Sequence, residues 1–252
     1  MCHSPEDQPR IRNIGGAAAD HGAVFLTSRD GTKVAAYFAR AAKASGSGIV
    51  VLPDAGGLSD FYRELTKRFA EAGIDAVAID YYARTAGIGS RPEGFNADEH
   101  MAMTRPESVD ADVAAGAAFL RSKEGGAVKS LFAVGFCFGG ANSWRQARNG
   151  LDGAIGFYGS GVALRETVPD LRVLRSPLLL LVAAADPYFP LADSQLIDRE
   201  LEAAGVAHTT VVYEGAPHGF FSSGDWQDTC DDAWRQTLRF IEHNSANRVP
   251  TC

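Results

Sequence analysis

Hydrophobic and polar positions along the chain form blocks that predict short buried strands separated by amphipathic helices. Three apolar runs have the length of strands: residues 48–54 (GIVVLPD), 74–80 (IDAVAID) and 177–186 (PLLLLVAAAD). Residues 60–73 (DFYRELTKRFAEAG) instead carry apolar side chains at helical spacing and end at Gly73, a common helix-capping residue. Continuously apolar strands between such helices are typical of a parallel sheet that is covered on both faces.

The same patterns predict the other elements. We expect strands at residues 129–136, 151–160 and 208–215, and helices at residues 106–123, 139–150, 191–205 and 228–244. Residues 23–40 predict two strands that reverse at Asp30-Gly31, because this dipeptide favours a tight turn. The stretch from residue 81 to residue 106 shows no regular period and is expected to be a long irregular loop, which in a compact domain is usually functional or mobile.

These elements predict an α/β fold: a mostly parallel central sheet with an antiparallel N-terminal edge and helices on both faces. Neither a repeat nor a low-complexity linker interrupts them, so we expect one domain over residues 21–243. Residues 1–20 are polar and aperiodic and are expected to form a flexible tail, and residues 244–252 are expected to fray. In sheets of this kind, active sites gather at the carboxyl ends of the strands.

Composition and charge narrow the class of protein. The 252 residues are 46% hydrophobic and 22% charged, as in soluble globular proteins, and the net charge of −7 argues against nucleic-acid or anionic-membrane partners. No apolar stretch is long enough to span a bilayer, and the N-terminus lacks the apolar core of a secretory signal. The cysteines (Cys2, Cys137, Cys230 and Cys252) form no C-x-x-C pair, so we expect reduced thiols, a cytoplasmic location and neither disulfide framework nor zinc site.

A thiol, a carboxylate and an imidazole follow three of the predicted strands. Cys137, Asp186 and His218 come in the chain order nucleophile, acid, base that is typical of α/β-hydrolases. Each residue by itself also has a structural explanation, as a buried cysteine, a turn former before Pro187 or a loop histidine. Their joint occurrence at three strand ends, in this order, favours catalysis.

The sequence around Cys137 has the form of a nucleophile elbow. Gly135-x-Cys137-x-Gly139 is the thiol form of the G-x-S-x-G turn, in which side chains at the flanking positions would collide with the turn. A thiol at a helix N-terminus is biased toward thiolate by the helix dipole. The backbone N–H groups of Phe138 and Ala55 are the expected donors of an oxyanion hole.

Five segments, GFCFGGA, DYYAR, GFYGSG, AAADPYFP and YEGAPHGF, resemble those of the dienelactone hydrolases (carboxymethylenebutenolidases), and the likeness runs from about Phe25 to Ile241. Members of that family are single-domain α/β-hydrolases that open lactones or esters with a Cys-His-Asp triad. The resemblance implies Cys137 as nucleophile, His218 as base and Asp186 as acid, with an acyl-thioester intermediate and no cofactor.

The resemblance also implies roles around the triad. Arg84 matches an arginine that binds a substrate carboxylate, although an arginine in a long loop is often solvated or ion-paired. Tyr158 and Phe220 match residues near the substrate pocket. Asp54 matches a family glutamate that pairs with the resting thiol and helps to form the thiolate.

Two departures from the family pattern affect these expectations. Asp54 is one methylene shorter than the family glutamate, which puts its reach to the thiol in doubt. Members that take carboxylated dienelactones carry a second arginine after the histidine motif, where this chain has Phe221 and Ser222. We therefore expect weaker binding of carboxylated lactones. Several aromatic residues predict a more apolar pocket, unless they belong to the core: Tyr188, Phe189, Phe220, Phe221 and Trp226.

The sequence thus predicts hydrolysis of a small-molecule lactone or ester by a monomer or small homo-oligomer. Three alternatives stay open: a general carboxylesterase or thioesterase with an apolar substrate, a non-catalytic ligand-binding protein of the same fold, and a redox-sensing thiol. No metal site is expected, because His100 beside Asp98 and Glu99 does not have the spacing of a known ligand set.

Overall fold

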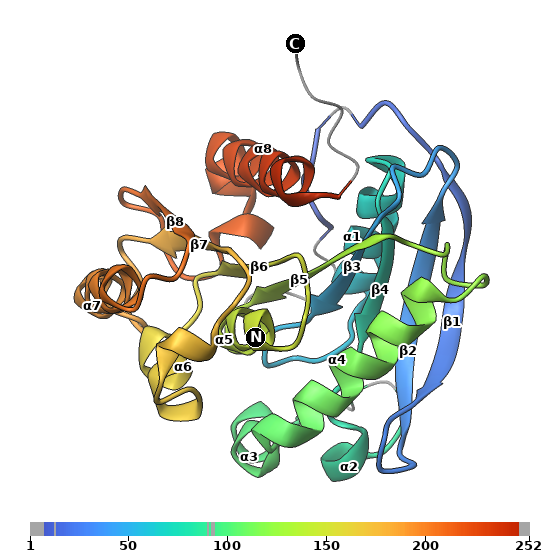
Figure 1. The fold of residues 1–252 in the computed structure, drawn as a ribbon, viewed down its shortest axis with the longest axis horizontal. Helices are drawn as coiled ribbons and strands as arrows, with labels where there is room; N and C mark the ends of the chain where they lie inside the picture. The colour runs from blue at the N-terminus through green and yellow to red at the C-terminus, as the bar shows by residue number, and fades with distance from the viewer. Residues whose placement is uncertain (1–7, 13, 90, 92–93, 247–252) are drawn as a thin grey trace.

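An eight-stranded sheet forms the centre of the computed structural model, which describes residues 8–12, 14–89, 91 and 94–246 (Figure 1). Its strands lie in the order β1-β2-β4-β3-β5-β6-β7-β8. The strands are β1 (Ala18–Thr27), β2 (Lys33–Ala41), β3 (Ser47–Leu52), β4 (Asp75–Ile79), β5 (Ser130–Phe136), β6 (Gly153–Phe157), β7 (Leu178–Ala183) and β8 (His208–Tyr213). β2 pairs antiparallel with β1 and β4, and all other pairs are parallel. The predicted parallel sheet with an antiparallel N-terminal edge is confirmed.

Helices cover both faces of this sheet, as predicted. The α-helices are α1 (Asp60–Glu71), α2 (Ala83–Ala86), α3 (Ala97–Met103), α4 (Pro106–Arg121), α5 (Phe138–Arg145), α6 (Gly161–Thr167), α7 (Leu191–Ala203) and α8 (Gln227–Asn244). Short 3-10 segments are η1 (Gln146–Arg148), η2 (Leu171–Val173), η3 (Phe220–Ser222) and η4 (Gly224–Trp226). α1 and α8 pack on one face of the sheet, and α4, α5 and α7 pack on the other.

Alternate residues of each central strand enter opposite core layers. In β3, Ile49 and Val51 pack with α1 and α8, whereas Val50 and Leu52 pack with α4. Successive side chains of a strand point to opposite faces, so a strand covered on both faces must be apolar at every position. This explains the continuous apolar runs of the sequence.

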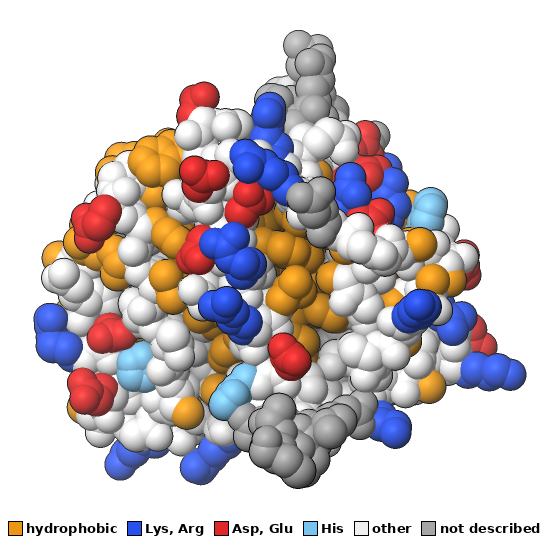
Figure 2. Space-filling model, turned by 90° about the horizontal axis from the view of Figure 1, so that it is seen from above, with side chains coloured by type: hydrophobic (Ala, Val, Ile, Leu, Met, Phe, Trp, Pro, Cys, Tyr) orange, Lys and Arg blue, Asp and Glu red, His pale blue; other side chains and the backbone are white. Residues whose placement is uncertain are grey.

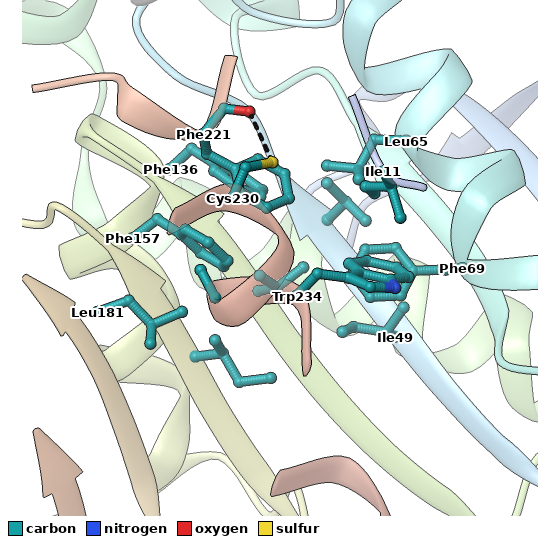
Figure 3. Close-up of a cluster of buried hydrophobic side chains, with 14 of the residues drawn as sticks. Ile11, Ile49, Leu65, Phe69, Phe136, Phe157, Leu181, Phe221, Cys230 and Trp234 are labelled. Carbon is teal, nitrogen blue, oxygen red and sulfur yellow. Dashed lines mark hydrogen bonds between the residues drawn. The ribbon is translucent and has the colours of Figure 1, made fainter. Parts of the chain in front are cut away.

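The cluster under α8 also accounts for one of the cysteines (Figure 3). Cys230 is fully buried beside Phe136 and Trp234, and its thiol donates a hydrogen bond to the carbonyl oxygen of Phe221 at 3.4 Å. Burial raises the pKa of Cys230 to about 12. At neutral pH this thiol is therefore protonated, and it serves the packing of the core.

Three segments differ from the sequence prediction. The stretch expected to be an irregular loop contains the short helices α2 and α3. A further short helix that was not predicted, α6, follows β6, and Ser160 caps it by accepting a hydrogen bond from the Ala163 N–H at 3.1 Å. The flexible tail predicted for residues 1–20 is too long, because β1 begins at Ala18 and Ile11 is buried in the core. Residues 1–7 and 247–252 of the two predicted tails lie outside the described residues.

Charged side chains of both signs occur on the surface of the molecule. Acidic and basic side chains are interspersed on the face seen in Figure 2, with hydrophobic side chains between them. Within the described ranges, no helix combines the length and the apolar character needed to cross a membrane.

Candidate active site

Cys137 occupies a strained turn between β5 and α5. Its backbone angles are φ 53° and ψ −114°, a conformation that residues with a side chain rarely adopt. The Cys137 N–H donates to the Phe157 carbonyl at 3.0 Å, and the Cys137 carbonyl accepts from the Gly140 N–H at 2.9 Å. These bonds hold the thiol at the carboxyl end of the sheet, at the start of a helix.

The glycines around Cys137 are required by close approach of the backbone. A Cβ atom on Gly135 would lie 1.9 Å from the Gly139 carbonyl oxygen, and one on Gly139 would lie 2.3 Å from the Leu52 carbonyl oxygen. A Cβ on Gly140 would lie 2.8 Å from the Cα of Gly159. The turn therefore packs backbone against backbone, which explains why the sequence has glycine on both sides of the thiol.

His218 lies between the Cys137 thiol and the Asp186 carboxylate. Nδ1 of His218 lies 2.5 Å from Oδ2 of Asp186, and the other carboxylate oxygen accepts the N–H groups of Tyr188 (2.8 Å) and Phe189 (3.0 Å). The His218 side chain also forms a hydrogen bond with that of Cys137. The structure thus brings together three residues that are 32 to 81 positions apart in the chain.

The environment of His218 favours its charged form. Burial disfavours the imidazolium, but the hydrogen bond with Asp186 and the interaction with Cys137 outweigh this cost and raise the pKa of His218 to about 9. The imidazolium then persists at neutral pH and is lost as the pH rises through about 9. A charged imidazole next to a thiol stabilises the thiolate.

This pKa can be tested directly. We expect the imidazole signals of His218 in NMR spectra to titrate near pH 9, and to titrate at lower pH in Asp186→Asn, because the variant removes the carboxylate that stabilises the imidazolium. Because His218 and Cys137 interact, the titration belongs to the pair. Titration of His218 at or below its ordinary pKa in the wild-type protein would contradict this account.

Aromatic rings surround the His218 imidazole. The rings of Tyr158, Tyr188 and Phe189 approach it edge-on, with centroid distances of 4.9, 5.1 and 5.2 Å. Tyr158 has φ +37° and is buried against the imidazole, so it supports His218. Phe220 is completely buried and packs on Tyr158 and Tyr213. Neither ring lines the cavity, since Tyr158 packs on His218 and Phe220 packs on Tyr158, and contact of either ring with a substrate stays a prediction.

The loop after β3 is held by tyrosines from two other segments. The Tyr81 hydroxyl donates to the carbonyl oxygens of Pro53 and Asp54, the latter at 2.8 Å. The Tyr62 hydroxyl accepts the Asp54 N–H at 2.9 Å. These bonds fix the backbone that leads into Ala55, the residue predicted to contribute one oxyanion donor.

Ala55 and Phe138 both line the cavity next to Cys137. The Tyr82 hydroxyl donates to the Ala55 carbonyl at 3.2 Å, so this bond also holds the Ala55 backbone. Within the described part of the chain, neither the Ala55 N–H nor the Phe138 N–H has a hydrogen-bond acceptor. Two such donors beside a nucleophile are the geometry that an oxyanion hole requires.

Asp54 is fully buried in the same loop. Its Oδ1 accepts the Gly56 N–H at 2.7 Å, an interaction of a short side chain with its own turn. Burial is the main cause that raises the pKa of Tyr81, and the charges of Asp54 and Cys137 contribute to the same shift. Asp54 therefore stabilises the turn that contains Ala55. Its charge also disfavours ionisation of Tyr81, which interacts electrostatically with the thiol of Cys137.

Arg84 does not line the cavity, contrary to its predicted role in binding a substrate carboxylate. Its guanidinium forms two hydrogen bonds with Asp30 (2.8 and 3.0 Å) and two with Asp112 (2.8 and 2.9 Å). These hydrogen bonds raise the pKa of Arg84 further above its ordinary value. Because two carboxylates already hold the guanidinium on both sides, we propose no substrate contact for Arg84.

The cavity has a volume of about 760 Å³ and runs along one face of α5. Five residues of this face recur at helical spacing: Cys137, Phe138, Ala141, Asn142 and Arg145. Other walls come from α6 (Ser160, Ala163, Thr167), from α3 and the start of α4 (Asp98, Met101, Thr104, Pro106), and from Tyr188 and Phe189 beside His218.

Sequence reasoning missed Arg145. A signal was available, since Arg145 lies eight positions after Cys137, on the same face of the predicted helix. Of the aromatic residues expected at the pocket, Tyr188 and Phe189 line it, whereas Phe221 is buried in the core.

The fold and the site together define an α/β-hydrolase. The dienelactone hydrolase family model matches residues 34–245, so the chain belongs to the dienelactone hydrolase family. As a member of this family, the protein is a hydrolase that acts on ester or lactone bonds.

Individual relatives cover most of the chain. It is 28% identical to the carboxymethylenebutenolidase of Pseudomonas putida over 204 residues, 78% of this chain and 84% of that protein. A Synechocystis protein assigned as a carboxymethylenebutenolidase is 26% identical over 208 residues, 77% of this chain and 85% of that protein. A crystal structure of a Klebsiella pneumoniae protein assigned as a dienelactone hydrolase superposes with a TM-score of 0.79 at 25% identity, covering 88% of this chain and 98% of that one.

Proposed function

We propose that the protein hydrolyses a small carboxylic ester or lactone through a Cys137–His218–Asp186 triad and an acyl-thioester intermediate. The observation that carries the proposal is the continuous contact from carboxylate to imidazole to thiol beside a cavity. The same cavity is lined by Ala55 and Phe138, whose N–H groups have no acceptors among the described residues. The assignment of the triad rests on this geometry together with membership of the family.

The first half of the reaction forms the acyl-enzyme. The thiolate of Cys137 attacks the carbonyl carbon, and the resulting oxyanion accepts hydrogen bonds from the N–H groups of Phe138 and Ala55. The bond between the carbonyl carbon and the ester oxygen then breaks. The His218 imidazolium gives its proton to the leaving oxygen, which remains part of the same molecule when the substrate is a lactone.

The second half releases the acid. Neutral His218 takes a proton from water, the hydroxide attacks the thioester carbonyl, and the thiolate leaves. Asp186 keeps the imidazole oriented and stabilises its charge throughout. A thiol nucleophile suits substrates with good leaving groups, such as enol lactones, because a poor alkoxide leaving group lets the thiolate be expelled instead.

A general esterase is the second candidate, and one observation favours it. Arg84 is bound to two aspartates, and the position of the missing second arginine is occupied by the buried residues Phe221 and Ser222. The two arginine contacts that the family resemblance associates with carboxylated dienelactones therefore do not face this cavity. Comparing kcat/KM for cis- and trans-dienelactone with that for p-nitrophenyl esters separates the two candidates.

The proposed intermediate can be detected by intact-mass measurement. We expect p-nitrophenyl acetate to release a burst of nitrophenol and to leave an acetyl group on Cys137, because thioester formation precedes hydrolysis. Peptide mapping is expected to leave Cys230 unmodified, since its buried thiol has a pKa of about 12. Absence of both burst and adduct, together with tight binding of an ester analogue, would instead indicate a non-catalytic binding protein.

A further inference from the structure

Arg145 is a buried cation in the wall of the cavity, at the opposite end of α5 from the thiol. The side chain is 2% exposed, and Arg145 lines the cavity together with Thr104, Pro106 and Thr167. Arg145 lies eight positions after Cys137, which places the two Cα atoms about 12 Å apart along the helix axis. The cavity therefore has a reactive end and a cationic end.

One nitrogen of the guanidinium is left for a ligand. Nε donates to Asp110 Oδ1 at 3.1 Å, and Nη2 donates to the Pro106 carbonyl at 2.7 Å and lies 3.1 Å from the same Asp110 oxygen. Among the residues that the structure describes, Nη1 has no acceptor. Nη1 is not one of the fully buried side-chain atoms that lack a partner, so solvent or a ligand oxygen can reach it, and a carboxylate there would gain a charge-assisted hydrogen bond.

The charges around Arg145 do not cancel. Asp110 is shared between Arg145 and Arg148, whose Nη2 lies 2.7 Å from its second oxygen, so two guanidinium groups face one carboxylate. Glu107 also acts on Arg145, but it is exposed to solvent, which screens its charge. Asp98 also lines the cavity, and it is exposed to solvent. It lies near the start of α3, whereas Thr104 follows the end of α3 and is the one close in the chain to Pro106, whose carbonyl binds Arg145.

The positions of the lining residues favour the acyl part of the substrate at this end. His218 protonates the leaving group, which must therefore lie toward Tyr188 and Phe189. The acyl chain then extends along α5 past Ala141 and Asn142 toward Arg145. One available guanidinium nitrogen suits a singly charged carboxylate, whereas a phosphate dianion would need several charged donors.

We propose that Arg145 binds a carboxylate at the far end of the acyl chain, so that the preferred substrates are esters or lactones of acids with a second, distal carboxylate. This subsite rests on the proposed function, and it differs from the position of Arg84. Arg145 gives the cavity a group that can bind a substrate carboxylate, and it lies on the helix that begins directly after the nucleophile.

The experiment compares p-nitrophenyl monoesters of dicarboxylic acids, from succinate to sebacate, with the same compounds methylated on the distal carboxylate. We expect kcat/KM for the acidic ester to exceed that for its neutral partner by about tenfold at one range of chain lengths, because only the charged carboxylate forms a charge-assisted hydrogen bond with Arg145. A uniform effect of charge at all lengths would overturn the assignment to a site at fixed distance.

Matched variants locate the effect. Arg145→Gln is expected to bring the acidic-to-neutral ratio close to one, whereas Arg148→Gln is expected to preserve the ratio, because Arg148 pairs with the same Asp110 but does not line the cavity. Arg145→Lys retains the charge and is expected to give an intermediate ratio, which keeps the test decisive if the glutamine variant does not fold. A folded Arg145→Gln or Arg145→Lys variant with the full wild-type ratio would overturn the subsite.

The two proposals fail in distinguishable ways. Acylation of Cys137 by both members of each ester pair at equal rates would remove the subsite and leave the proposed function intact. Acylation by neither member, at any chain length, would remove the proposed function itself.

Discussion

Replacing Cys137 by alanine is expected to lower kcat for hydrolysis of an activated ester by on the order of 10⁴-fold, because the covalent pathway loses its nucleophile. Cys137→Ser is expected to retain weak activity at best, since an alcohol is much less acidic than a thiol and the site is arranged to stabilise a thiolate. Both variants should fold normally, as measured by circular dichroism and thermal unfolding, because the side chains are similar to or smaller than cysteine.

The other described cysteine provides the control. Cys230→Ala removes a thiol that lies in the core, where it bonds the Phe221 carbonyl, so the variant is expected to keep its activity and to lose some stability. Full ester hydrolysis by Cys137→Ala, or an acyl adduct that maps to another residue, would rule out Cys137 as the nucleophile.

Gly135→Ala is expected to destabilise the protein by about 3 kcal/mol or more, or to prevent folding. The new Cβ would lie 1.9 Å from the Gly139 carbonyl oxygen, an overlap that only backbone movement relieves. Such movement would shift the turn that carries Cys137, so activity is expected to fall with stability. Urea unfolding followed by tryptophan fluorescence measures the change in the free energy of unfolding.

The matched control for this substitution is Gly22→Ala in β1. There a Cβ would meet only Phe38 Cε1, at the ordinary contact distance of 3.7 Å. Its effect on the free energy of unfolding is expected to be well below that of Gly135→Ala. Equal stability of the two variants would show that the backbone at the elbow is not as tightly packed as these distances indicate.

Most of the fold was predictable because its signals are local. Continuous apolar strands and amphipathic helices carry their periodicity in neighbouring residues, whereas the order of the strands in the sheet came only from the structure. α6 escaped prediction because it is one short helix directly after a strand, and its main local signal is a single capping serine, Ser160. Ile11 was assigned to a tail because its burial depends on α1 and α8, which are remote in sequence.

The candidate triad could be proposed from the sequence for a topological reason. Parallel strands bring their carboxyl ends to one edge of the sheet, so residues that follow β5, β7 and β8 must lie near one another. The same reasoning located Ala55 after β3. It could not reveal which oxygen accepts which N–H, and the bonds from Tyr62 and Tyr81 to the loop before Ala55 were not expected.

By itself, the sequence determined the nucleophile turn and the sheet edge on which the candidate catalytic groups meet, since both follow from short-range backbone rules. Only the tertiary structure decided which arginine faces the cavity. Arg84 is held by Asp30 and Asp112, which lie 54 and 28 positions away, whereas Arg145 reaches the cavity wall on α5. A charged side chain binds whatever carboxylate the fold brings beside it, so its partner depends on distant segments that no local pattern records.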